Sequence, residues 1–156
     1  MLLHMTGQQD QAAKWYEKTI ELNPEQVIAM NNLAWILCTE QSQYRKALEI
    51  AEKGLQLRAS YVDLIDTRGV IYMHLNEYEK AAQDFQRCER MYFDVNPSKT
   101  AAVFRLAKCL LELKKEQEAL VKLYKAQDMN AANGGLSSEE LADLDQMIQK
   151  IASRTM

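Results

Sequence analysis

Histidines and cysteines are the residues of this chain whose types best suit chemistry. The 156 residues include two histidines, His4 and His74, and three cysteines, Cys38, Cys88 and Cys109. A cysteine nucleophile needs a nearby base and a further group that orients it. His74 and Cys38 fall on helices expected to be adjacent, but no oxyanion donor or third group accompanies them. The cysteines are widely spaced within apolar stretches, which predicts buried, reduced thiols.

Motifs that would carry catalysis or hold a cofactor are absent from the sequence. There is no glycine-rich phosphate loop, no metal-ligand cluster and no nucleophile signature. The sequence therefore predicts a protein that is not an enzyme and that uses no cofactor and no metal.

Composition favours a folded, helical chain. It is 47% hydrophobic and 26% charged, with only five Gly and two Pro, which predicts one all-α globular domain. The net charge of −3 gives no basic footprint for nucleic acid. No apolar run is long enough for membrane insertion, and the opening "MLLHM" is too short for a signal peptide. A soluble, cytoplasmic chain is expected, with a fragment of an exported protein as the alternative.

Small and large residues recur along the chain at fixed intervals. Within residues 68–85, Gly69 and Tyr72 are spaced G-x2-Y, and Ala81 and Phe85 are spaced A-x3-F. Their counterparts elsewhere are Ala34, Leu37, Ala47, Ala51, Ala107, Leu110, Ala119 and Leu123. The small-residue anchors recur after 35, 34 and 38 residues, at Ala12, Ala47, Ala81 and Ala119. This pattern resembles the tetratricopeptide repeat (TPR), a helix hairpin of about 34 residues, up to about residue 131.

The resemblance implies an α-solenoid of helix hairpins wound into a right-handed superhelix. Two antiparallel helices approach closely only where small side chains meet, so we expect paired small residues at each crossing. These pairs are Ala34 with Ala47, Gly69 with Ala81, and Ala107 with Ala119. The expected helices are 9–22, 26–39, 43–57, 61–75, 78–94, 99–113, 116–129 and 138–153.

The repeat positions also predict the domain boundaries. We expect a single TPR domain over 1–156, made of a truncated first repeat (1–25), three repeats (26–59, 60–97 and 98–131) and a capping helix (137–154). Ser137 and Glu140 form a capping-box signature for that last helix. A solvating helix of this kind closes a repeat stack.

Two departures from the repeat period predict local changes. The turn "CTEQSQY" holds one residue more than its counterparts, so it is expected to protrude. Four additional residues separate Ala81 from Ala107, about one helical turn. We expect them to lengthen the helix around "FQRCERMYF", which must end before Pro97.

In TPR proteins the first helix of each hairpin lines a concave groove that binds a peptide or a partner's helix. The resemblance implies that the equivalent positions of each repeat line such a groove here. The residues expected to line it are Asn31, Asn32, Trp35, Thr39, Asp63, Asp66, Thr67, Val70, His74, Phe104, Arg105, Lys108 and Glu112. Asn32 fits the chaperone-tail binders, but Asp63 and Thr67 stand where their carboxylate clamp needs basic residues. Asn32 also fits the asparagine ladder of O-GlcNAc-transferase-like repeats, where Thr67 and Arg105 break the series.

Three basic residues on first helices have two interpretations each. Arg68 replaces the leucine of neighbouring repeats, so its side chain either snorkels or pairs with a carboxylate such as Asp63 or Asp66. Arg105 and Lys108 lie one turn apart and either meet an acidic partner or form a solvated face.

The expected function is a non-catalytic interaction module whose partner is a protein or peptide held in the groove. The alternative is a regulatory or targeting segment of a larger polypeptide, for example a glycosyltransferase-like enzyme.

At the N-terminal end, counting back from Ala12 places its partner helix before Met1, so only about the last turn of that helix is expected in the chain. Helix 9–22 would then leave Ala12, Tyr16 and Ile20 uncovered. Either the protein continues upstream, or this end pairs with a second copy as a weak homodimer.

Overall fold

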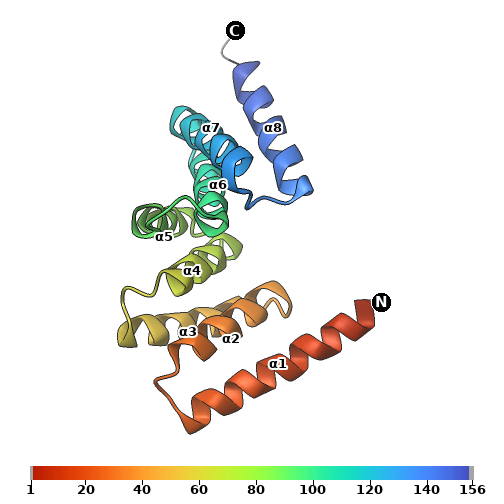
Figure 1. Cartoon of the computed structure of the whole chain (residues 1–156), viewed down its shortest axis with the longest axis vertical. Coiled ribbons are helices and arrows are strands. Elements are labelled where there is room, and N and C mark those ends of the chain that lie inside the picture. The colour runs from red at the N-terminus through yellow and green to blue at the C-terminus, as the bar shows by residue number, and fades with distance from the viewer. Residues whose placement is uncertain (1, 155–156) are drawn as a thin grey trace. The chain divides into compact units, whose positions relative to one another are not determined.

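The computed structural model describes residues 2–154, with side chains from residue 7 onward, and the regular structure in this range is α-helical (Figure 1). The helices are α1 (Leu2–Leu22), α2 (Val27–Thr39), α3 (Tyr44–Leu57), α4 (Val62–His74), α5 (Tyr78–Met91), α6 (Pro97–Glu112), α7 (Glu116–Asn133) and α8 (Ser138–Ala152). They form two compact units, which divide between Glu77 and Tyr78. The all-α solenoid class is confirmed. No helix in the described range is long and apolar enough to cross a bilayer.

The first unit is organised around α2, which packs on α1, α3 and α4. Ala34 on α2 and Ala47 on α3 are both fully buried, as expected for small residues where two helices cross. Gly54 on α3 is a further small residue at such a contact, because a Cβ there would run into Leu64 of α4. The surrounding core is filled by Met30, Leu33, Leu37, Ile65 and Ile71.

The second unit is organised around α6, which packs on α5 and α7, while α8 packs on α7. Ala107 and Ala119 are fully buried. Leu144 and Ile151 of α8 join the core that α6 and α7 form. The predicted capping box is present, since the Ser137 hydroxyl accepts from the Glu140 amide (3.2 Å) and the Glu140 carboxylate accepts from the Ser137 amide (2.8 Å).

Turns within the repeats share a left-handed residue. Ser42, Asn76 and Lys114 have φ values of 53°, 59° and 59°. In each turn the next amide donates back to the preceding helix, as from Lys115 to the Leu110 carbonyl (2.8 Å). Between α2 and α3 four residues (40–43) connect the helices, against three in the other two turns. The additional residue predicted there is confirmed.

The predicted lengthening of the helix after residue 78 is wrong. Helix α5 ends at Met91 and has 14 residues, the same number as α3. The additional residues lie in the loop 92–96 and in α6, which has 16 residues against 13 in α2 and α4. Asn96 and Pro97 explain this, because the Asn96 side chain caps the Lys99 amide (2.9 Å) and proline is favourable at the first helical position.

The prediction for the N-terminal end is also wrong. Helix α1 runs unbroken from Leu2, so the residues before 9 extend this helix and do not form the end of a preceding one. Gly7 weakens a helix there, but the glutamines that follow it favour helix. Ala12, Tyr16 and Ile20 are half-buried, whereas Trp15 and Leu22 are 73% and 77% exposed. Pairing with a second copy through this surface stays a prediction.

Candidate functional site

The candidate site in the first unit is the face of α2 and α4 on which groove residues were predicted. Trp35 is 37% exposed on α2, and Asp63 and His74 are exposed on α4. Thr39 is also exposed, while Asn31, Asn32 and Asp66 are half-buried. Thr67 is 3% and Val70 8% exposed, so the prediction that these two side chains meet a ligand is wrong. Thr67 instead contacts Asn31 of α2, and Val70 is part of the buried core.

A chain of polar contacts joins three helices beneath this face. The Thr67 hydroxyl donates to the Asn31 side-chain carbonyl (2.8 Å), and the Asn31 amide donates to Asn32 (3.4 Å). The Asn32 amide in turn donates to the Tyr16 hydroxyl of α1 (3.1 Å). These bonds satisfy the polar groups that α1, α2 and α4 bring together, and they hold the two asparagines in one orientation.

Two other predicted residues of α4 are engaged by aromatic rings. His74 stacks on Tyr44 of α3, with ring centroids 4.8 Å apart and an interplanar angle of 9°. The guanidinium of Arg68 lies over the Tyr72 ring, 5.7 Å from its centroid, a cation–π arrangement that accommodates a half-buried arginine. His74 is therefore positioned by the hairpin end of α3.

In the second unit the predicted groove residues lie on α6, and they separate into different environments. Phe104 is 1% exposed within the core with Val103 and Leu123, so its predicted contact with a ligand is wrong. Its ring packs inward because α7 and α8 surround it with apolar side chains such as Leu123 and Leu144. Arg105 and Lys108 are half-buried, and the Lys108 ammonium pairs with Asp143 of α8 at 3.0 Å.

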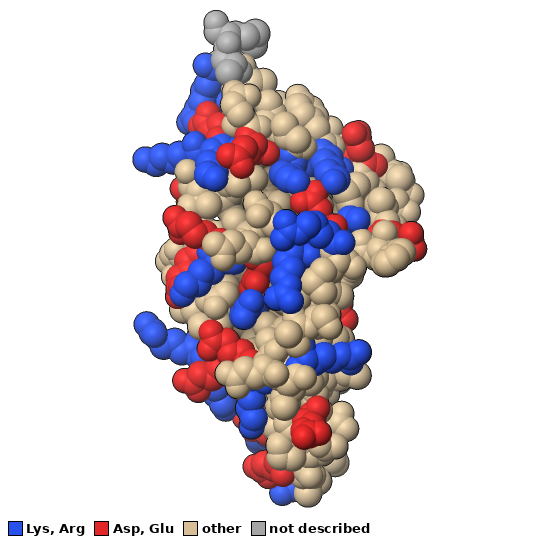
Figure 2. All heavy atoms as spheres, turned by 90° about the vertical axis from the view of Figure 1, so that its left-hand side faces the viewer, with Lys and Arg blue, Asp and Glu red and all other residues tan. Residues whose placement is uncertain are grey.

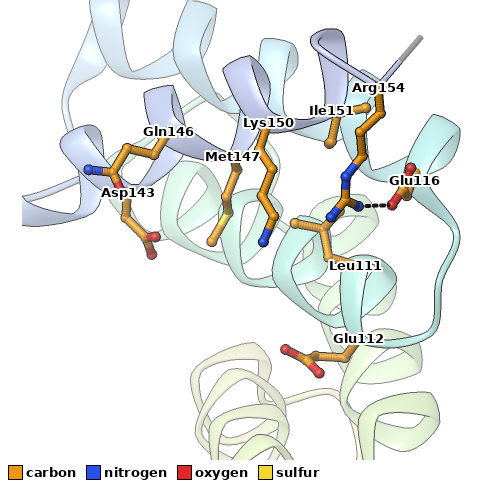
Figure 3. A pocket seen from close by; sticks show the side chains of 9 residues that line it. All are labelled: Leu111, Glu112, Glu116, Asp143, Gln146, Met147, Lys150, Ile151 and Arg154. Atoms are coloured by element: carbon orange, nitrogen blue, oxygen red, sulfur yellow. Dashed lines mark hydrogen bonds and ion pairs between the residues drawn. The ribbon is translucent and has the colours of Figure 1, made fainter.

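Two hollows lie along α8 on this side of the second unit. The first, hollow A, has a volume of about 370 Å³ and is bounded by α6, the start of α7 and α8. Its lining residues are Leu111, Glu112, Glu116, Asp143, Gln146, Met147, Lys150, Ile151 and Arg154 (Figure 3). The second, hollow B, has a volume of about 460 Å³, and its lining residues are Lys108, Glu139, Glu140, Ala142, Asp143 and Gln146. The repeat pattern could not predict the lining residues that α8 supplies, because α8 lies outside the repeats.

Charged residues of both signs lie on the surface. Figure 2 shows Lys and Arg side chains interspersed with Asp and Glu side chains over one face. The Glu89 carboxylate of α5 forms ion pairs with Lys122 and Lys125 of α7, at 2.7 and 2.8 Å. Burial alone would raise the pKa of Glu89, but the two lysine hydrogen bonds outweigh it and hold that pKa below its usual range.

The cysteines are buried free thiols, as predicted. Burial raises the pKa of Cys38 to about 11 and that of Cys109 to about 12, which disfavours the nucleophilic thiolate. Among the described residues, no group of three His, Cys, Asp or Glu side chains is placed to hold a metal ion. His4 lies outside the described side chains.

The fold and these surfaces define a helical repeat protein of the hairpin-stacking class. Models of the tetratricopeptide repeat match residues 15–49 and 67–133, together more than half of the chain. The chain belongs to the tetratricopeptide repeat family. Repeats of this family are in general non-catalytic interaction modules that use extended surfaces. No curated protein matches the chain significantly.

Solved structures support the same fold. YrrB, a TPR protein with an unusual peptide-binding site, is 26% identical over 76% of this chain and 59% of its own, with a TM-score of 0.67. Pseudomonas aeruginosa pilF is 19% identical over 96% of this chain and 62% of its own, with a TM-score of 0.77. MamA from Desulfovibrio magneticus RS-1 is 17% identical over 83% and 71%, with a TM-score of 0.70. The chain thus spans about three fifths of the length of the first two.

Proposed function

We propose that this protein is a non-catalytic module that binds an extended peptide, or a partner's helix, along the exposed face of its first helices. The observation that carries the proposal is the placement of Trp35. Helix α2 buries eight of its 13 residues, yet it presents this tryptophan, 37% exposed, next to two asparagines that are already oriented by hydrogen bonds. Tryptophan is among the residue types that contribute most at binding surfaces.

Amide side chains beside an aromatic ring suit the recognition of a peptide main chain. The asparagines offer both donors and acceptors, while the ring supplies apolar area at a small cost in side-chain entropy. The similarity to YrrB, whose structure holds a peptide-binding site, supports the same class of ligand. The family's general role as an interaction repeat supports it further.

Trp15 provides a matched control for a binding test, because it is also an exposed tryptophan but lies on α1, outside the predicted groove. A displayed library of random peptides would be selected on the immobilised chain, and the affinity of the enriched peptides measured by fluorescence anisotropy. Trp35→Ala should weaken their binding about tenfold, as expected for an aromatic anchor, while Trp15→Ala leaves it unchanged. Failure to enrich any peptide, or equal affinity of both variants and the parent chain, would refute the proposal.

A further inference from the structure

The two hollows of the second unit share a boundary. Asp143 and Gln146 line both of them, and α8 supplies residues to each. The Lys108–Asp143 ion pair, at 3.0 Å, crosses from α6 to α8 at that boundary. A ligand that occupies both hollows would therefore pass Asp143 and Gln146, which line both.

Hollow A has an apolar floor of Leu111, Met147 and Ile151 within a rim that includes the charged side chains of Glu112 and Lys150. Leu111 and Met147 are half-buried and pack on the core that includes Ile151. Figure 3 shows the Met147 and Lys150 side chains of α8 extending toward α6, with Leu111 on the opposite wall. Arg154 is held at the far edge by Glu116, at 2.8 Å. An apolar side chain of a ligand would cover Leu111 and Met147 and remove their exposed surface from water.

Hollow B offers negative charge. Its three carboxylates, Glu139, Glu140 and Asp143, outnumber the single ammonium of Lys108. Glu140 is used by the capping box and Asp143 by Lys108, whereas the Glu139 carboxylate extends from the exposed first turn of α8. The net charge of this lining favours a cationic side chain over an anionic or neutral one.

The distance between the two hollows sets the spacing of the ligand's side chains. On α8, the acidic residues of hollow B are centred near residue 141, and the apolar residues of hollow A are centred near residue 149. A helix rises about 1.5 Å per residue, so these two centres lie about 12 Å apart. An extended peptide covers this length in three to four residues, at about 3.3 Å each.

We infer that the α6–α8 face binds an extended peptide carrying an Arg or Lys side chain in hollow B and, three or four residues away, a large apolar side chain in hollow A. This inference rests on the proposed peptide-binding function and specifies the ligand for one part of it. It also assigns α8 a second role, because the helix that caps the stack becomes one wall of the binding site.

Synthetic peptides of defined spacing test this assignment. The probes are fluorescein-labelled Gly/Ser peptides of about ten residues, each with one Arg and one Leu at separations from one to six residues. Affinity for the full chain, measured by anisotropy, should be highest at a separation of three or four. Replacing Arg by Glu or Leu by Ser in the best probe should weaken binding about tenfold. A flat dependence on spacing would overturn the inference.

Gln146 and Gln149 give a matched pair of variants on the protein. Both are exposed glutamines of α8, but Gln146 lines both hollows and Gln149 lines neither. Gln146→Arg should weaken the best probe about tenfold, Gln146→Glu should strengthen it by about threefold, and Gln149→Arg should leave it unchanged. Because both sites are exposed, thermal melting should confirm an intact fold for all three variants.

The outcomes separate this inference from the proposed function. If library-selected peptides bind and depend on Trp35, but show neither an Arg–Leu spacing preference nor any effect of Gln146→Arg, the inference is wrong and the proposed function stands. If no peptide binds the chain at all, both are wrong.

Discussion

Helices α2 and α6 occupy the same place in their repeats, yet they present different surfaces. The equivalent positions are Asn31 and Phe104, Asn32 and Arg105, Trp35 and Lys108, and Thr39 and Glu112. On α2 the polar groups are neutral and bonded to α1 and α4, and the exposed anchor is aromatic. On α6 the half-buried Arg105 and Lys108 and the exposed Glu112 are charged, and Lys108 is bonded to Asp143, which lines both hollows.

The difference follows from which residue type packs inward at the first of these positions. Phe104 buries its ring in the core, whereas Asn31 accepts a hydrogen bond from the buried Thr67 of α4. The two helices thus share a place in the repeat but differ in their neighbours, because only α6 has α8 beside it to form the hollows. Four substitutions test this comparison.

The largest effect is expected at Gly135, in the segment that leads into α8. Its φ is 120°, and a Cβ there would collide with the main-chain carbonyl of Pro97. Gly135→Ala should lower the free energy of unfolding by about 3 kcal/mol, because strained φ and a backbone clash add. Gly134 is the control, since its φ is 70° and a Cβ there meets nothing. Gly134→Ala should cost about 1 kcal/mol. Equal losses in urea unfolding would show that the contact with Pro97 does not hold this segment.

The polar chain under α2 should give the second largest effect. Asn31→Ala removes the acceptor of the Thr67 hydroxyl, which is 3% exposed, and leaves that hydroxyl without a partner. We expect a loss of about 2 kcal/mol. In a double-mutant cycle with Thr67→Val, the double variant should cost clearly less than the sum of the single ones. Additive losses would mean that the bond does not couple α2 to α4.

In the second unit, the ion pairs of Glu89 link α5 to α7, as the Asn31–Thr67 hydrogen bond links α2 to α4 in the first. The pKa of Glu89 is held below its usual range by Lys122 and Lys125, so this residue contributes stability above its unfolded-state pKa of about 4.3 and loses it as pH falls through the lower folded-state value. Glu89→Gln should cost about 1 kcal/mol at neutral pH. Chemical unfolding followed from pH 7 to pH 3 should show the difference from the parent chain disappear. A pH-independent difference would contradict the ionic origin.

Lys114 should give the smallest change, and in the stabilising direction. It has a φ of 59° in the turn between α6 and α7, a conformation that glycine adopts without cost. Lys114→Gly should raise the free energy of unfolding by about 0.5 to 1 kcal/mol. Lys114→Ala is the control, because it removes the side chain beyond Cβ but keeps Cβ itself. Thermal unfolding should show no gain in stability for this variant.

The repeat pattern predicted most of the fold because its small residues report contacts within one hairpin. Ala34, Ala47, Ala107 and Ala119 are all fully buried, and the capping box at Ser137 forms as expected. The same pattern failed where a local competition decided the outcome. Helix α6 begins at Pro97, before the predicted start at 99, because Asn96 offers a cap that the spacing of alanines does not register.

The candidate site was less accessible to sequence reasoning than the fold. Phase places a residue on a helix face, but exposure depends on what the neighbouring helix brings. Thr67 and Phe104 share the predicted groove face and are both buried, one by hydrogen bonding and one by apolar packing. The hollows along α8 arise from a helix outside the repeat, so the repeat period carries no information about residues such as Gln146 and Met147.

The buried cysteines give each unit its own reporter of transient opening. With a pKa of about 11, the Cys38 thiol is ionised in only about one molecule in ten thousand at pH 7. Alkylating reagents therefore modify it mainly when local unfolding exposes it and restores an ordinary pKa. Cys38 lies in the first unit, and Cys88 and Cys109 lie in the second. Mass spectrometry of timed alkylation would thus measure the opening free energies of the two units in a single sample, without an introduced label.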